Sequence, residues 1–169
     1  MVYTAAQKLI DPFYPPGLQQ YWKSSFLSEI SDAAVDTMVS YCASRPSPLC
    51  HVVIGHTLGG VVSRIGGDAT AFNHRNVQYS CLSLGVCTDP AEADKCMRWA
   101  HELWEAMQPF TTGSVYVNYL GQEADEGVER LKAAYGPEKY QRLVALKNKY
   151  DPSNLFRLNQ NIKPTLTAT

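Results

Sequence analysis

The sequence has none of the short motifs that most often hold nucleotides or catalytic metals. Its 169 residues contain no P-loop, no GxGxxG after a strand pattern and no HExxH. Residues 55–60 (GHTLGG) hold three glycines, but their spacing does not fit a dinucleotide fingerprint and favours a turn between strands. His51 and His56 stand five positions apart in a strand-like run, where alternation places their side chains on opposite faces. We therefore predict no metal site and no nucleotide-binding loop.

Long apolar runs and an excess of charge of one sign are also absent. No run approaches the roughly 20 apolar residues that a membrane-spanning helix needs. The N-terminus lacks the basic region and long apolar core of a secretory signal. The net charge is −1 and the pI is about 6.4, so no long-range attraction to nucleic acid or to an anionic membrane is expected.

Cysteine is present, but in odd number and without a CxxC pair, so neither a zinc site nor a disulfide framework is expected. The pattern favours buried free thiols and a cytoplasmic location. The five cysteines are Cys42, Cys50, Cys81, Cys87 and Cys96.

Hydrophobic periodicity predicts strands and helices in alternation. Glycine-bounded, β-rich runs predict strands at 19–27, 51–56, 61–65, 79–86 and 113–120. Helical spacing and caps predict helices at about 32–44, 89–108, 124–135 and 137–149. The fold class expected is α+β, an antiparallel sheet with helices on one face and an irregular C-terminal tail. We divide the chain into a lead-in segment (1–18), an α+β unit (19–149) and a tail (150–169).

Two segments are unusually polar for their surroundings. One is the run 116–119 (YVNY), and the other is the amide cluster 159–161 (NQN). Buried amides need hydrogen-bond partners, which can be the backbone or a polar planar ligand, and the residues alone leave both open. His74 lies in a third polar cluster, for which a structural turn is the first interpretation.

These segments carry a family resemblance. Residues 147–164 (KNKYDPSNLFRLNQNIKP) resemble the closing motif of the berberine bridge enzyme-like FAD-linked oxidases. Five further stretches match in order: 21–24 (YWKS), 59–60 (GG), 70–75 (TAFNHR), 116–119 (YVNY) and 134–136 (AYG). Together they extend over most of the chain from about residue 20 onward.

The resemblance implies the substrate-side part of a two-part enzyme. In that family an N-terminal domain binds FAD, and a C-terminal α+β domain covers the flavin ring and shapes the substrate pocket. Such an enzyme oxidises a CH–OH or CH–N group of a small molecule by hydride transfer to the flavin. We find no flavin-binding segment here, so FAD and the catalytic activity are expected to depend on a flavin-binding domain, upstream or in a separate chain.

The resemblance also implies roles for particular residues. Tyr119, at the end of the YVNY motif, is expected to be the base that accepts the substrate proton, although a phenol with an ordinary pKa near 10 needs a positive neighbour or the flavin to act so. Tyr116, Asn118, Asn159 and Asn161 are expected on the flavin side. In a regular strand Tyr116 and Tyr119 face opposite sides, so both reach one site only if the strand ends or bulges near Asn118.

The sequence departs from the family pattern at two places. The alkaloid-oxidising plant members carry a glutamate base on the strand after the His-Arg segment, whereas 79–87 (YSCLSLGVC) holds no acid. Asn73 stands where the family usually has proline before the histidine.

The alternative is a non-enzymatic remnant that binds a small molecule or a partner. In that case the face that once covered the flavin is apolar and exposed, which favours self-association.

Overall fold

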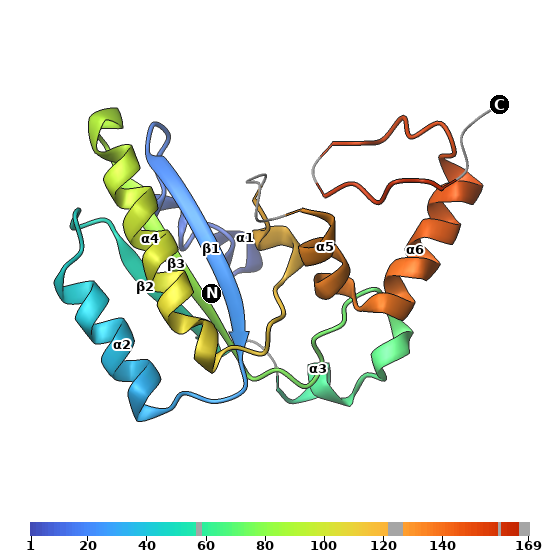
Figure 1. Cartoon of the computed structure of the whole chain (residues 1–169), viewed down its shortest axis with the longest axis horizontal. Coiled ribbons are helices and arrows are strands. Elements are labelled where there is room, and N and C mark those ends of the chain that lie inside the picture. Colours follow the sequence, from blue (N-terminus) through green and yellow to red (C-terminus); the bar gives the residue numbers. More distant parts are fainter. Residues whose placement is uncertain (57–58, 122–126, 159, 166–169) are drawn as a thin grey trace.

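The chain folds around a three-stranded antiparallel sheet with strand order β1-β3-β2 (Figure 1). The computed structural model describes residues 1–56, 59–121, 127–158 and 160–165. The strands are β1 (Gln19–Leu27), β2 (His51–His56) and β3 (Tyr79–Cys87). Because β3 pairs along both edges, it is the best covered strand, and its run from Ser80 to Cys87 is buried throughout.

One face of the sheet packs on two long helices, α2 (Asp32–Ala43) and α4 (Ala93–Met107) (Figure 1). Ser31 caps α2, because its hydroxyl accepts the backbone N–H of Ala34 at 3.3 Å. Asp89 accepts the N–H of Ala91 at 2.9 Å, and a single 3₁₀ turn (Pro90–Glu92) precedes α4. The buried residues of α4 follow helical spacing and form one stripe: Cys96, Trp99, Ala100, Leu103 and Met107.

A second group of helices lies beside β1. It contains α5 (Val128–Tyr135) and α6 (Pro137–Tyr150), which are joined at Gly136 and pack on a separate small core (Figure 1). Gly136 has a φ of 77°, a left-handed value that glycine adopts without steric cost. The remaining short elements are α1 (Tyr3–Ala6), α3 (Val61–Arg64) and the 3₁₀ turns Asp11–Phe13, Gly67–Ala69, Gln108–Phe110 and Val117–Tyr119.

The predicted α+β class and antiparallel sheet are confirmed, and two predicted strands are wrong. Residues 61–64 form helix α3, since Gly60 turns the chain with a φ of 59° directly before it. The predicted strand 113–120 pairs with β1 only at its beginning, where the N–H of Phe26 donates to the carbonyl of Ser114 at 3.1 Å. The chain then turns into the 3₁₀ helix Val117–Tyr119.

Three further expectations concern a helix boundary, the cysteines and membrane-spanning helices. The helix predicted at 124–135 begins at Val128 in the structure, and its first residues lie outside the described part of the chain. All five cysteines are free, and all but Cys42 are buried, as predicted. Within the described ranges, no helix combines the length and apolarity needed to cross a bilayer.

Candidate functional site

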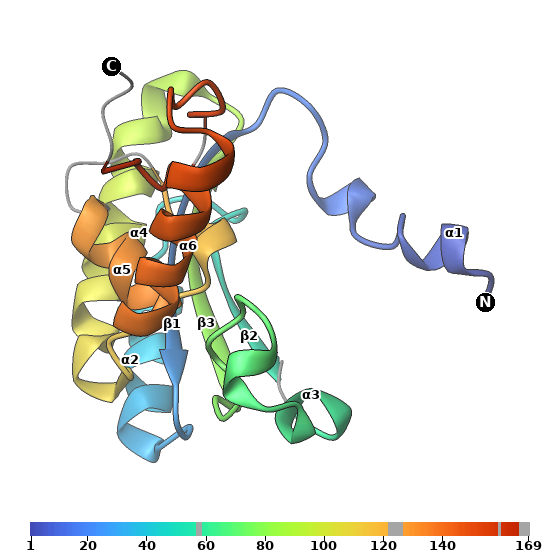
Figure 2. The same ribbon diagram turned by 90° about the vertical axis from the view of Figure 1, so that its right-hand side faces the viewer.

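The sheet face opposite α2 and α4 carries a hollow of about 530 Å³. The N-terminal segment passes on this side of the sheet, away from the helices (Figure 2). The floor of the hollow consists of Leu82, Leu84 and Val86 of β3. Strand alternation explains why these three residues form the floor, because they point to one face while Cys81 and Cys87 point into the helix-covered core.

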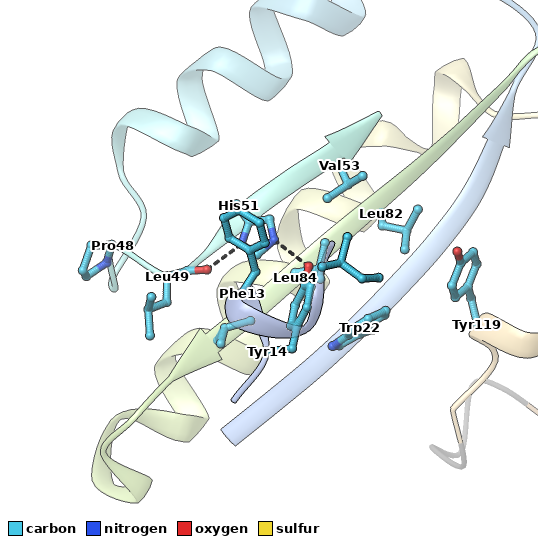
Figure 3. A pocket seen from close by; sticks show the side chains of 12 residues that line it. Phe13, Tyr14, Trp22, Pro48, Leu49, His51, Val53, Leu82, Leu84 and Tyr119 are labelled. Atoms are coloured by element: carbon cyan, nitrogen blue, oxygen red, sulfur yellow. Dashed lines mark hydrogen bonds between the residues drawn. The ribbon is translucent and has the colours of Figure 1, made fainter. Parts of the chain in front are cut away.

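The register of the sheet brings an aromatic and a histidine side chain to the same row. Leu84 pairs with Trp22 of β1 on one side and with His51 of β2 on the other. Directly paired residues share a face, so Trp22 and His51 flank the apolar floor (Figure 3). Tyr14, from the lead-in segment, lies over this row, with its ring centroid 5.7 Å from that of Trp22.

Tyr119 lines the same hollow beyond Trp22, with a ring-centroid distance of 6.3 Å (Figure 3). The 3₁₀ turn Val117–Tyr119 meets the requirement set by the sequence, because it ends the extended run before Asn118. Tyr116 and Tyr119 consequently approach each other edge to face, with ring centroids 5.4 Å apart. The structure thus brings both phenols of the YVNY motif to one place.

Asn118 is tied to Tyr116 rather than pointing into the hollow. Its side-chain amide donates a hydrogen bond to the Tyr116 hydroxyl at 2.9 Å, and the Asn118 side chain is exposed. The Tyr116 ring also meets Phe72 at 5.9 Å. These contacts hold the turn in shape and leave the free side of Asn118 available to a group that approaches from outside the chain.

The C-terminal tail reaches the same turn through Gln160. The side-chain amide of Gln160 donates to the carbonyls of Leu120 (2.7 Å) and Gly121 (3.2 Å). Next to it, the buried carbonyl oxygen of the Asn161 side chain has no hydrogen-bond partner among the described residues. Asn159, the other predicted flavin-side amide, lies outside the described residues.

The hollow is nearly uncharged. Its described lining contains no aspartate, glutamate, lysine or arginine, so His51, Tyr14 and Tyr119 are the only residues there with titratable side chains. Burial raises the pKa of Tyr14, and the proximity of Tyr119 raises it further. No carboxylate base and no cation is therefore placed beside Tyr119 by the described residues.

His74 and Cys81 lie outside the hollow and are buried in the protein interior. His74 is buried between Phe26 (4.5 Å) and Phe72 (5.6 Å), and burial lowers its pKa despite nearby backbone groups of Ala134 and Val115. Burial also raises the pKa of the Cys81 thiol to about 12, which makes it inert. In the described part of the chain, no three metal-binding side chains stand together.

Sequence reasoning missed three residues of the hollow. Trp22 has a signal, since alternation in 19–27 places it opposite the core-facing Tyr21. The spacing of His51 from His56 bears only on metal binding, and Tyr14 stands in a proline-rich lead-in without periodicity. Their convergence depends on the pairing of β1 and β2 with β3 and on the path of residues 10–14.

Comparison with known proteins identifies relatives of this chain. Residues 115–163 match the family described as "Berberine and berberine like". An FAD-linked oxidoreductase of Dictyostelium discoideum is 28% identical over 163 residues, which cover 96% of this chain and 34% of that protein. The FAD-linked oxidoreductase YgaK of Bacillus subtilis is 31% identical over 157 residues, covering 90% and 34%. The chain therefore spans about one third of the curated relatives it matches.

The fold itself is also found in solved structures. The berberine bridge enzyme of Eschscholzia californica superposes with a TM-score of 0.75 at 21% identity, covering 89% of this chain and 34% of that one. At this identity the likeness concerns the fold. It agrees with the sheet and helices described above.

Proposed function

We propose that this chain, which belongs to the berberine bridge enzyme-like family of FAD-linked oxidoreductases, is the substrate-side portion of an enzyme that oxidises a CH–OH or CH–N group. The position of Tyr119 carries this proposal. Its ring stands at the hollow beside Trp22, supported from behind by Tyr116.

The open side of the hollow fits a flat cofactor, which would close it over a substrate lying on the aliphatic floor. The aromatic walls suit the planar ring system of a flavin, and the carbonyl and N–H groups at the edge of that ring suit amide partners. In this proposal Tyr116, Asn118, Asn159 and Asn161 contact the flavin. FAD itself is held mainly by a flavin-binding domain, which has no counterpart in these 169 residues.

The flavin, when bound, supplies the acceptor for the substrate hydride. The chain's own residues position the substrate and take its proton. The hydroxyl proton passes to Tyr119 as a phenolate while the C–H bond breaks, which leaves a neutral phenol and avoids the build-up of charge on the substrate oxygen. No lysine or arginine lines the described hollow, so a group that stabilises this phenolate has to come from the flavin-binding domain.

The composition of the hollow favours alcohols over amines. Residues 82, 84 and 86 of β3 face the hollow as Leu, Leu and Val, so this strand offers no carboxylate to pair with a protonated amine or to act as base. Oxidation of CH–OH is the reaction that the described residues support best.

The test is to join the chain to its flavin-binding domain and follow the bleaching of the flavin absorbance by alcohols in the absence of oxygen. We expect Tyr119→Phe to slow flavin reduction by about 10²- to 10⁴-fold, since it removes only the proton-accepting oxygen. Tyr150→Phe, at an exposed tyrosine far along α6, is the matched control and keeps the full rate. An unchanged rate in Tyr119→Phe would refute the role of this residue.

The alternative function is a binding module without catalysis. It is favoured by one observation, that the hollow is formed by the chain's own residues. A joined protein that binds alcohols in the hollow but never bleaches its flavin would support this alternative against the enzyme.

A further inference from the structure

The hollow contains a hydrogen-bonded pair that the proposed reaction does not use. The Tyr14 hydroxyl and the Nε2 atom of His51 are 3.2 Å apart, and the Nδ1 atom of His51 is 2.6 Å from the carbonyl oxygen of Leu49 (Figure 3). Both side chains are only half-buried and both line the hollow. They stand on the other side of Trp22 from Tyr119 (Figure 3).

The direction of these hydrogen bonds follows from the chemistry of their ends. A carbonyl oxygen only accepts, so Nδ1 of His51 carries a hydrogen and donates to Leu49. In the neutral imidazole Nε2 is then the acceptor, and the Tyr14 hydroxyl donates to it. The Leu49 carbonyl thereby fixes the tautomer of His51, and His51 fixes the hydroxyl of Tyr14.

This arrangement makes the Tyr14 hydroxyl a hydrogen-bond acceptor toward the hollow. Its hydrogen is engaged with His51, so the lone pairs of its oxygen are what it offers to a ligand. Burial and the neighbouring Tyr119 raise the pKa of Tyr14, which keeps it a neutral phenol. A neutral acceptor in an uncharged, largely apolar hollow suits a hydroxyl donor, and it disfavours carboxylates, which offer only further acceptors.

We infer that Tyr14 and His51 form a second polar anchor, which binds a hydroxyl group of a neutral ligand on the side of Trp22 away from Tyr119. The apolar body of the ligand lies across Trp22 and Leu84 between the two tyrosines. This inference deepens the proposed function, because it makes the anchor a specificity determinant for substrates with a hydroxyl beyond the one that is oxidised. It requires no flavin, so it can be tested on the 169-residue chain alone.

The probe is phenol, compared with anisole, which has the same ring without the hydroxyl hydrogen. Binding is followed by the indole N–H signal of Trp22 in two-dimensional NMR, identified by its loss in Trp22→Phe. The indole signals of Trp99 and Trp104 report the fold, because both are hydrogen-bonded in the protein interior, to the Tyr41 carbonyl and the Ser25 hydroxyl. We expect phenol to bind about 3- to 10-fold more tightly than anisole, the effect of one hydrogen bond.

Three variants separate the anchor from a merely structural role. Tyr14→Phe removes the acceptor, and we expect phenol to fall to the affinity of anisole. His51→Leu frees the Tyr14 hydroxyl to donate. The affinity for acetophenone, whose carbonyl only accepts, is therefore expected to rise relative to the affinity for phenol. His51→Gln restores an acceptor for Tyr14 and is expected to restore the preference for phenol.

The controls are Tyr3→Phe in the same N-terminal segment and His101→Leu on α4, which we expect to leave both affinities unchanged. The inference is overturned if phenol does not shift the Trp22 signal, if Tyr14→Phe binds phenol as tightly as the unaltered chain, or if His51→Leu weakens phenol and acetophenone equally. A joined enzyme that does not oxidise alcohols, in a chain that keeps the phenol preference, refutes the proposed function and leaves the anchor standing.

Discussion

Single residues set how closely the layers of this fold approach, and Gly85 is the tightest of the glycines whose surroundings the structure describes. It lies on β3 opposite Tyr21, on the face that packs against α4. A Cβ atom at this position would stand 2.2 Å from the carbonyl oxygen of Cys96 and 2.6 Å from its carbonyl carbon. Both are backbone atoms, which cannot move aside without displacing the helix.

We therefore expect Gly85→Ala to lower the free energy of unfolding by about 1–3 kcal/mol or more, as overpacking does. Urea unfolding followed by circular dichroism measures the change. Gly66→Ala is the matched control, because no atom lies within 4 Å of a Cβ there, and its backbone φ is negative. Equal stability of the two variants would show that α4 adjusts its distance to the sheet.

At the scale of elements, Asp151 organises the turn that follows α6. Its carboxylate accepts the backbone N–H groups of Leu155 (2.7 Å) and Phe156 (3.1 Å) and forms an ion pair with Lys147. The hydrogen bond from Lys147 is the largest cause that lowers the pKa of Asp151, and these two backbone N–H groups add to it. The carboxylate of the residue that directly follows α6 thus holds the start of the tail motif.

The lowered pKa of Asp151 determines how its contribution to the stability of the folded chain changes with pH. A carboxylate whose pKa is lower in the folded chain stabilises it above the ordinary aspartate pKa of about 4, and the contribution is lost as the pH falls through the lowered value. We expect Asp151→Asn to accelerate amide hydrogen exchange at Leu155 and Phe156 by roughly tenfold at neutral pH, since charge-assisted bonds are replaced by weaker ones.

The exposed Asp36→Asn on α2 serves as control and leaves these amides unchanged. Below the lowered pKa, the unaltered chain and Asp151→Asn are expected to exchange at similar rates. Protection of Leu155 and Phe156 that persists in Asp151→Asn at neutral pH would contradict the role of the carboxylate.

At the scale of the whole molecule, the chain spans about one third of its curated relatives and exposes apolar side chains at both ends. In the N-terminal segment Phe13 is 73% exposed, and in the tail Phe156 is 78% exposed. In the proposed function these surfaces and the open sheet face meet the flavin-binding domain.

The chain alone is expected to lose added FAD on desalting, because the residues proposed to contact the flavin are few. The visible absorbance of the desalted protein measures this directly. A flavin band that remains would mean that the chain holds the cofactor by itself, and the proposed need for a separate flavin-binding domain would be wrong.

The same exposed surfaces are expected to promote self-association of the isolated chain. Analytical ultracentrifugation across a concentration series tests it, with Phe13→Ser and Phe156→Ser expected to shift the chain toward monomer. A monomer at all concentrations would show that the exposed side chains are too dispersed to pair.

The elements that could be predicted from sequence are those with local causes. The cap at Ser31 and the apolar stripe of α4 determine helices at the predicted positions, and β-rich runs determine the three strands. The 113–120 run was predicted as a strand because its residues favour one, but it finds a partner only at the end of β1 and then turns. Local propensity cannot report whether a partner strand is within reach.

The class of fold, the free thiols and the motif that carries Tyr116 and Tyr119 can be predicted from the residues alone. That these two phenols meet, and that Trp22, His51 and Tyr14 surround one hollow with Tyr119, follows only from the folded chain. Caps and periodicity act within a few residues, whereas the hollow depends on the register of strands far apart in the chain and on the path of the lead-in segment.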